Sequence, residues 1–300
     1  MAKTTTFNVH VPATSANLGT GYDSLGVALD LFSSIKISFG EESPTNDQGS
    51  GEKLVLDAIS SFYTKIGKTP ASATVNFLVS QPLGRGLGSS ASARVGGILA
   101  ANKFEGEPLD KEACLELATA LEGHPDNACP AIFGGIQVCV KKTENTYIHS
   151  TCQYPDLLIA LLIPNKGLAT SKARNILPSQ YSREDAIHNS SRTALLVAAL
   201  TEKRIDLLEE AMNDRFHQPQ RSKLFSPMYD IFSAAKDSGA SASWLSGAGS
   251  SIAAFCTNKD IANDVASAML LSLENADLQG RTVITQISQT GAYLEESDKK

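Results

Sequence analysis

The sequence predicts an α+β protein made of one large domain or two ordinary ones. Stretches in which apolar and polar residues alternate, typical of strands, are mixed with longer stretches that have helical spacing. The two kinds do not follow one another in strict strand–helix alternation, and this irregular order favours the α+β class. The chain has 300 residues, 42% of them hydrophobic, which is enough for a substantial buried core.

The first half of the chain contains most of the predicted strands. Alternation predicts strands at residues 7–11, 34–39, 73–80, 132–140 and 156–164. Helical spacing predicts helices at residues 54–67, for about four turns after the serines at 89–90, and at 109–123 with Asp110 as N-cap. The polar stretches at 12–24 and 40–53 are interpreted as loops, the second exposed and mobile, and the prolines of "HPDNACP" (124–130) as the end of the third helix. A short hairpin is expected within 141–155, with a domain boundary near Gln153.

The second half is mainly helical in prediction. Helices are expected at residues 185–203, 205–216, 227–239 and 261–274, with Pro227 at a first helical position. The stretch 241–256, "SASWLSGAGSSIAAFC", predicts a strand, a glycine turn and a second strand, and residues 281–287 predict a last strand.

Charge and cysteine usage exclude several classes of protein. The net charge of −6 and the lack of a Lys/Arg cluster argue against nucleic acid as the main partner. No uncharged apolar run reaches the roughly 18 residues that a membrane span needs, and the first residues lack an apolar signal core. The five cysteines are odd in number and irregular in spacing, so we expect buried thiols in a cytoplasmic protein: Cys114, Cys129, Cys139, Cys152 and Cys256.

A glycine-rich stretch, "QPLGRGLGSSASA" (81–93), is typical of a phosphate-binding loop. It lies between a predicted strand and a predicted helix, whose N-terminus presents unpaired N–H groups and a partial positive charge. Gly84, Gly86 and Gly88 allow close approach of the backbone to a ligand, and Ser89 and Ser90 add hydroxyl groups. The loop lacks the lysine of a Walker A motif, and Ser89 replaces the third glycine of a dinucleotide fingerprint. From this stretch alone, a plain glycine turn before a helix stays an alternative.

Two further stretches, at opposite ends of the chain, extend this pattern. "VPATSANLGTGYDSLGVAL" (11–29), "PLGRGLGSSASA" (82–93) and "WLSGAGSSIAAF" (244–255) together resemble the three signature motifs of the GHMP kinases. This family is named for galactokinase, homoserine kinase, mevalonate kinase and phosphomevalonate kinase. The first motif and "GHPDNACPAIFGG" (123–135) resemble its homoserine kinase branch most closely. The resemblance implies the GHMP kinase fold. It consists of an N-terminal ATP-binding α/β sandwich like ribosomal protein S5 domain 2 (1–155) and a C-terminal ferredoxin-like α+β domain (156–300).

The resemblance also implies ATP and Mg²⁺ as ligands. The phosphates would lie against the loop and the first turn of the following helix. The implied ATP-binding residues are Pro82, Leu83, Gly84, Arg85, Gly86, Leu87, Gly88, Ser89, Ser90, Ala91 and Ser92. Ser90 would bind the magnesium ion together with Glu116, which has the family's spacing to Asn127. Helical spacing places Glu116 nearly opposite the apolar face of its helix, so Glu122 is a rival ligand.

For the acceptor, the resemblance implies a site for the amino acid L-homoserine. Asp23 would bind its ammonium or hydroxyl group, and Arg174 and Arg221 its carboxylate, because arginine matches a carboxylate with two parallel hydrogen bonds. Arg215 competes with Arg221 for this role, and Gln218 stands where these kinases commonly have glutamate. The other implied substrate residues are Asn17, His124, Asn127 and Thr170.

The resemblance implies phosphoryl transfer from ATP to the side-chain hydroxyl of homoserine in a homodimer. A kinase of the same family with a different small hydroxyl acceptor, or a non-catalytic ligand sensor on the same fold, stays an alternative. Ser90, Asp23 and Asn127 are the expected catalytic residues. Some family members have an aspartate base where this chain has Asn127, which cannot accept a proton, and the adjacent Asp126 is the only alternative there. We therefore expect catalysis by positioning and charge neutralisation, without a strong general base.

Overall fold

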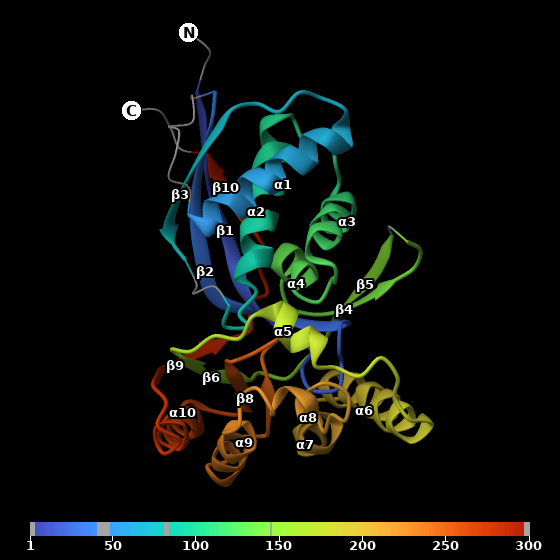
Figure 1. The fold of residues 1–300 in the computed structure, drawn as a ribbon, viewed down its shortest axis with the longest axis vertical. Helices are drawn as coiled ribbons and strands as arrows, with labels where there is room; N and C mark the ends of the chain where they lie inside the picture. The colour runs from blue at the N-terminus through green and yellow to red at the C-terminus, as the bar shows by residue number, and fades with distance from the viewer. Residues whose placement is uncertain (1–3, 41–48, 81–83, 145, 297–300) are drawn as a thin grey trace.

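The computed structural model describes residues 4–40, 49–80, 84–144 and 146–296, which form two antiparallel sheets with helices (Figure 1). The first sheet has the strand order β10-β1-β2-β4-β5, with β3 paired to β2 beside this path. The second sheet has the order β7-β8-β6-β9. The predicted α+β class is confirmed.

The first sheet and four helices form the upper layer pair in Figure 1. Its strands are β1 (Thr5–Ala16), β2 (Leu25–Phe39), β3 (Ala73–Val79), β4 (Ile136–Lys141), β5 (Tyr147–Cys152) and β10 (Tyr293–Glu296). The helices are α1 (Ser50–Ile66), α2 (Ser89–Phe104), α3 (Lys111–Glu122) and α4 (Ala128–Phe133). In α3, the side chain of Asp110 accepts a hydrogen bond from Ala113 N at 2.8 Å, which confirms the predicted N-cap.

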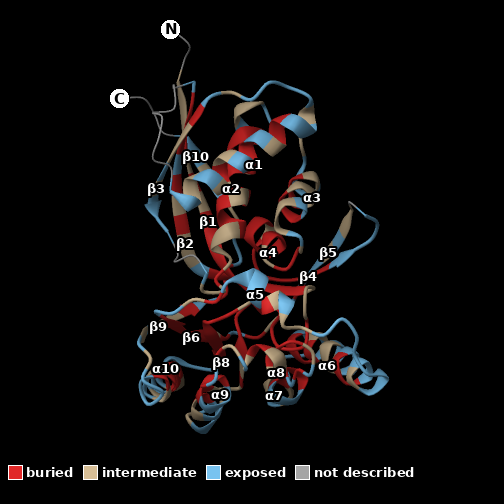
Figure 2. Cartoon of the chain, in the orientation of Figure 1, coloured by how far each residue is buried: buried red, intermediate tan, exposed pale blue. Residues whose placement is uncertain are grey.

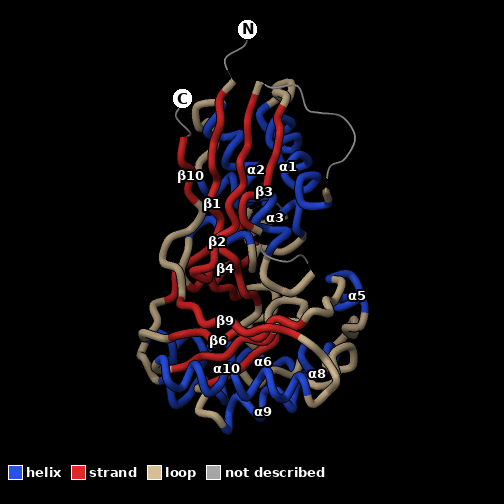
Figure 3. Tube along the Cα trace, turned by 90° about the vertical axis from the view of Figure 1, so that its left-hand side faces the viewer, coloured by secondary structure: helices blue, strands red, loops and turns tan. Residues whose placement is uncertain are grey.

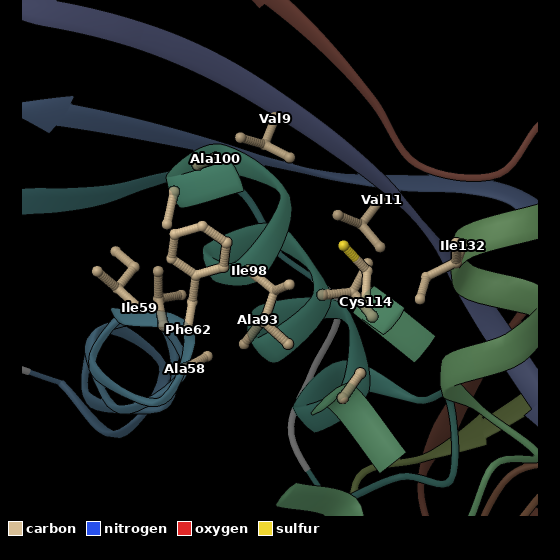
Figure 4. Packing of buried hydrophobic residues seen from close by; sticks show 14 of the residues in the cluster. Val9, Val11, Ala58, Ile59, Phe62, Ala93, Ile98, Ala100, Cys114 and Ile132 are labelled. Carbon is tan, nitrogen blue, oxygen red and sulfur yellow. The ribbon is translucent and has the colours of Figure 1, made fainter. Parts of the chain in front are cut away.

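Helix α2 is the centre of the first core. Figure 4 shows Ile59 and Phe62 of α1 on one side of Ala93 and Ile98 of α2, with Val11 of β1 nearby. Small residues on α2 allow this close packing: a Cβ atom at Gly97 would lie 2.5 Å from the carbonyl oxygen of Val55 in α1. The helix is therefore held firmly on both sides, and its N-terminus is fixed in place.

The helices at residues 228–237 and 259–274 lie on the face of the second sheet that is turned away from the first sheet (Figure 3), whereas those at 183–201 and 208–211 pack with its opposite face. Its strands are β6 (Leu158–Pro164), β7 (Ala242–Leu245), β8 (Ile252–Cys256) and β9 (Gly280–Gln286). The helical elements of this half are α5 (Thr170–Asn175), α6 (Arg183–Thr201), the 3₁₀ helix η1 (Ile205–Leu207), α7 (Leu208–Ala211), α8 (Gln218–Arg221), α9 (Met228–Asp237) and α10 (Lys259–Glu274).

The two halves share a core. One cluster of buried side chains joins Ala13 and Leu25 of the first sheet to Leu161 and Trp244 of the second, and Figure 2 shows buried segments running through this junction. The chain passes from the first sheet to the second between β5, which ends at Cys152, and β6, which begins at Leu158. Strand β10 departs from the predicted division at 155/156, because it returns to pair with β1, as in Phe7 opposite Glu296.

Several elements differ from the predictions. Strand β1 extends through Ala16 into the stretch predicted as loop, which leaves an open loop at residues 17–24, and β2 begins at Leu25, well before the strand predicted at 34–39. Pro130 does not exclude a helix: it lies in the first turn of α4, where its missing N–H would have no helical partner. The predicted helix at 205–216 ends at Ala211, and Pro227 caps α9 one residue before its start.

The cysteines behave as predicted, because all five are buried and free. Among the described helices, none is both long and apolar enough to span a membrane. The predicted mobile loop at 40–53 overlaps residues 41–48, which lie outside the described residues, and its end forms the first turn of α1.

Candidate active site

A cleft lies where the first sheet, α2 and the glycine loop meet the second half of the chain. It is lined by Asn17, Asp23, Gly84, Gly86, Leu87, Gly88, Ser89, Ser90, Ala91, Glu122, His124, Asp126, Asn127, Thr170, Arg174, Arg221, Gly247 and Ala248. All three signature motifs contribute to it. Most of the predicted site residues are therefore brought together, while Pro82 and Leu83 lie outside the described residues.

The glycine loop leads directly into α2. Gly84, Gly86 and Gly88 have φ of 67°, 77° and 66°, the left-handed region that favours glycine. A Cβ atom at Gly88 would lie 1.9 Å from Thr14 Oγ1 of β1, so only glycine fits. No side chain caps the start of α2, and its first turn opens into the cleft. This end of the cleft suits an anionic group.

Ser90 and Glu122 form the polar wall beside this helix end. Ser90 Oγ donates a hydrogen bond to Glu122 Oε1 at 2.8 Å, and Arg94 forms an ion pair with the same carboxylate. Glu122 is the last residue of α3, which ends at Gly123 with φ of 87°. A hydroxyl and a carboxylate oxygen in contact are the hard donors that Mg²⁺ prefers.

Glu116 does not reach this site. It lies on α3 more than one turn before Glu122 and lines a separate hollow with Lys65, Glu144 and Tyr147. The reason is the one that the helical spacing indicated: Glu116 projects away from the apolar face that packs α3 onto α2. Of the two candidates, the structure brings Glu122 and not Glu116 to Ser90.

The first motif ends in a strained loop that presents Asp23. Asp23 has φ of 56°, and its N–H donates to Asn17 Oδ1 at 3.0 Å, while Asn17 Nδ2 donates to Gly247 O at 3.1 Å. Asn17 thus joins the first and third motifs. Arg174 of α5 donates two hydrogen bonds to the Asp23 carboxylate, at 2.7 and 3.0 Å. These two predicted substrate residues are 151 positions apart in the chain and meet as a bidentate ion pair.

Arg221 is a buried cation in the wall of the cleft. It is 2% exposed, and burial lowers the pKa of its guanidinium. Its Nε donates to Ala173 O at 3.2 Å and its Nη1 donates to Gly247 O at 2.8 Å. Within the described parts of the chain it forms no ion pair, so its charge has no direct counter-charge. Arg215 instead lies at the surface beside Glu184 and Asp185, outside the cleft.

Three residues that support Arg221 were missed from the sequence. Asp214 accepts hydrogen bonds from His217 N and Gln218 N, at 2.9 and 2.7 Å, and so anchors the start of α8. Burial lowers the pKa of His217, whose Nε2 donates to Gly19 O at 2.8 Å; its Nδ1 then accepts from Arg221 Nη1 at 3.2 Å. The only signal in the sequence was the polar segment "NDRFHQPQR" around the predicted arginine.

Tyr22 is the third. Its ring lies 5.3 Å from the guanidinium of Arg221 and 5.8 Å from that of Arg174, within cation–π range of both. Its hydroxyl accepts a hydrogen bond from Arg174 Nη1 at 3.2 Å. The aromatic ring therefore holds the two arginines side by side despite their like charge.

The cleft is also lined by His124, Asp126 and Asn127. His124 Nδ1 pairs with the buried Asp126 carboxylate, and Thr14 Oγ1 donates to Asn127 Oδ1 at 2.8 Å. Asp23, His124 and Asp126 each present a ligand atom within 4.8 Å of the others. Two carboxylates in one corner match the charge of an ammonium group.

The His124–Asp126 pair predicts a pH dependence of stability. Burial lowers the pKa of His124, but the Asp126 carboxylate outweighs it, helped by Asp23 and opposed by Arg174, so the pKa lies above 6.5. A raised pKa contributes stability that is fully present below pH 6.5 and is lost as pH rises through the folded-state value. We expect this decline in the free energy of unfolding, measured by urea titration, to disappear in His124→Asn. An unchanged pH dependence in that variant would contradict the pairing.

Comparison with known proteins agrees with this geometry. The family model "GHMP kinases N terminal domain" matches residues 53–135, and "GHMP kinases C terminal" matches residues 196–274. The homoserine kinase of Desulfitobacterium hafniense is 36% identical over 294 residues, which cover 95% of this chain and 99% of that protein. This chain belongs to the homoserine kinase family. The homoserine kinase of Moorella thermoacetica is 40% identical over 259 residues, 84% of this chain and 88% of that protein.

Solved structures of related proteins have the same fold as this chain. The crystal structure of homoserine kinase from Cytophaga hutchinsonii matches with a TM-score of 0.87 and 26% identity, covering 97% of each chain. L. major mevalonate kinase in complex with R-mevalonate matches with a TM-score of 0.67 at 14% identity, which shows a shared fold. The homoserine kinase family thus carries the wider GHMP kinase fold.

Proposed function

We propose that this protein transfers the terminal phosphoryl group of ATP to the side-chain hydroxyl of L-homoserine, giving O-phosphohomoserine and ADP. The observation that carries the proposal is the buried guanidinium of Arg221, which forms no ion pair with any described residue and lies in the same cleft as the glycine loop. A buried cation without a counter-charge is costly, and a substrate carboxylate would neutralise it. The acceptor would then carry a carboxylate group as well as the hydroxyl group that is phosphorylated.

At the nucleotide end, the loop and the first turn of α2 bind the phosphates through backbone N–H groups. Ser90 and Glu122 would hold Mg²⁺, since their oxygen atoms already lie in contact. When bound, the ion neutralises charge on the phosphate oxygens. Arg94 forms an ion pair with Glu122 in the wall of the cleft.

At the acceptor end, the charges match those of an α-amino acid. Asp23 and Asp126 attract the ammonium group, while Arg174 and Arg221 attract the carboxylate. In the structure Arg174 binds Asp23, so the zwitterion would replace one internal ion pair by two intermolecular ones. Mevalonate and sugars lack the ammonium group and would leave Asp23 without a new partner.

Deprotonation of the acceptor would occur late, because the cleft has no ready base. Asn127 cannot accept a proton, and its Oδ1 is held by Thr14. Asp126 is held by its contact with His124, and this carboxylate raises the pKa of the His124 ring. These contacts support a mechanism of alignment and charge neutralisation, with Asn127 as a hydrogen-bonding partner of the hydroxyl.

The test is a substrate panel. ADP release is measured with Mg-ATP and L-homoserine, D-homoserine, L-serine, L-threonine, mevalonate or galactose. We expect a strong preference for L-homoserine, at least about 100-fold in kcat/KM, and its loss in Asp23→Ala. Turnover only with another acceptor would refute the substrate and keep the kinase. ATP binding without any turnover would refute the enzyme.

A further inference from the structure

Four consecutive carbonyl groups of the glycine loop accept hydrogen bonds from other parts of the chain. Gly84 O accepts from Leu168 N, Arg85 O from Ser251 N and Leu87 O from Thr14 N, each at 3.1 Å. Gly86 O accepts from Ser246 Oγ at 2.6 Å. In a trans peptide the C=O and the following N–H point in opposite directions. A bond that fixes one of these carbonyl groups therefore also fixes the N–H group of the next residue, on the opposite side of the same peptide.

Three of these four donors are backbone amides, and the fourth is the side chain of Ser246. That hydroxyl is the end of a buried relay. Trp244 Nε1 donates to Ser15 Oγ at 2.9 Å, and Ser15 Oγ lies 2.7 Å from Ser246 Oγ. Ser246 Oγ is in donor geometry to both Gly86 O and Ser15 Oγ, so its single hydrogen lies between these two acceptors. These contacts connect Trp244 and Ser15 to the carbonyl group of Gly86 through Ser246.

The relay is enclosed. Ser15, Trp244 and Ser246 are each 0% exposed, so water does not compete for these bonds. A Cβ atom at Gly86 would lie 2.0 Å from Ser246 O, which shows how closely the third motif approaches the loop. The relay therefore joins β1, the end of β7 and the glycine loop at one point.

We propose that Ser246, supported by Ser15, is a positioning residue for the ATP phosphates. It holds the Gly86–Leu87 peptide with its carbonyl outward and the N–H of Leu87 toward the cleft. Without the hydroxyl, this peptide is free to rotate, and a carbonyl oxygen turned inward would repel phosphate. The inference rests on the proposed function, since it assumes that the loop binds a nucleotide.

The test compares Ser246→Ala and Ser15→Ala with Ser250→Ala. Ser250 lies in the same loop, but its hydroxyl donates to Lys166 O at 2.5 Å and not to a carbonyl group of the glycine loop. Affinities for ATP and adenosine are measured by calorimetry, KM values by ADP release, and folding by thermal midpoint. We expect Ser246→Ala to weaken ATP binding about tenfold, the effect of one lost hydrogen bond and a misplaced dipole, with adenosine affinity and the KM for homoserine unchanged.

Ser15→Ala should weaken ATP binding in the same direction, and the double variant should be no weaker than Ser246→Ala, because the two hydroxyls act in series. Ser246→Thr, which keeps the hydroxyl, should retain ATP affinity. Equal losses for ATP and adenosine, an equal loss in Ser250→Ala, or unchanged ATP affinity in both Ser246→Ala and Ser15→Ala would overturn the inference. Failure of the proposed function would instead be visible in the wild type, as missing turnover of homoserine.

Discussion

Replacing Glu122 with glutamine is expected to lower kcat by about 100-fold or more, while Glu116→Gln leaves it near the wild-type value. The measurement is ADP release at saturating ATP and homoserine, repeated over a range of Mg²⁺ concentrations. We expect Glu122→Gln to require more Mg²⁺ for its residual activity. The two variants make the same chemical change on the same helix, α3, so they separate the two candidate ligands.

The physical reason lies in the contacts of Glu122. Its side chain is 9% exposed, and one of its oxygens contacts both Ser90 and Arg94. Glutamine keeps the shape but removes the charge, which weakens a hard-cation site and leaves Arg94 without its counter-charge. Glu116 lies in a separate hollow and has no such contacts with the cleft.

Stability must be controlled, because Arg94 loses its partner in Glu122→Gln. Thermal unfolding without nucleotide measures that cost, and kcat is then compared at a temperature where both variants are folded. If Glu116→Gln loses activity and Glu122→Gln does not, the assignment of the metal-binding wall is wrong. Ser90→Ala should resemble Glu122→Gln, since both residues are expected to bind the same ion.

The local sequence pattern was sufficient to predict those elements that depend only on neighbouring residues. The alternating strands, the N-cap at Asp110 and the glycine turn between β7 and β8 follow from neighbouring residues. Short elements were missed, because α5 and α8 contain six and four residues and are held by tertiary contacts such as the Asp214 carboxylate at the start of α8.

The choice between candidate site residues could not be made from the sequence either, because it depends on contacts between distant segments. The sequence left Glu116 and Glu122 as alternatives, because the choice depends on which end of α3 meets the start of α2. It likewise left Arg215 and Arg221 open, since α8 carries Arg221 inward while Arg215 faces Glu184 and Asp185. Tyr22 and His217 contact the arginines, and although Tyr22 lies within the first motif, the local sequence does not show that either residue meets an arginine far along the chain.

The second large effect is expected at Arg221. Arg221→Lys should raise the KM for homoserine about 100-fold or more and leave the dissociation constant of ATP within about twofold of the wild type. Lysine keeps a positive charge, but a single ammonium cannot reproduce the contacts of Nε with Ala173 O and of Nη1 with Gly247 O while also binding a carboxylate. Arg215→Lys is the matched control, and we expect no change in either constant.

The separation of the two constants distinguishes recognition from general damage to the fold. Arg221 lies between α5 and the third motif, so a collapsed pocket would weaken ATP and homoserine together. A selective loss of homoserine binding requires that the guanidinium contacts the acceptor. Amino alcohols that lack the carboxylate provide a second check: the wild type should bind them as poorly as Arg221→Lys does, because neither complex has the ion pair. If the KM for homoserine is the same in Arg221→Lys and in the wild type, the substrate carboxylate binds elsewhere. Arg174 is then the remaining arginine that lines the described cleft.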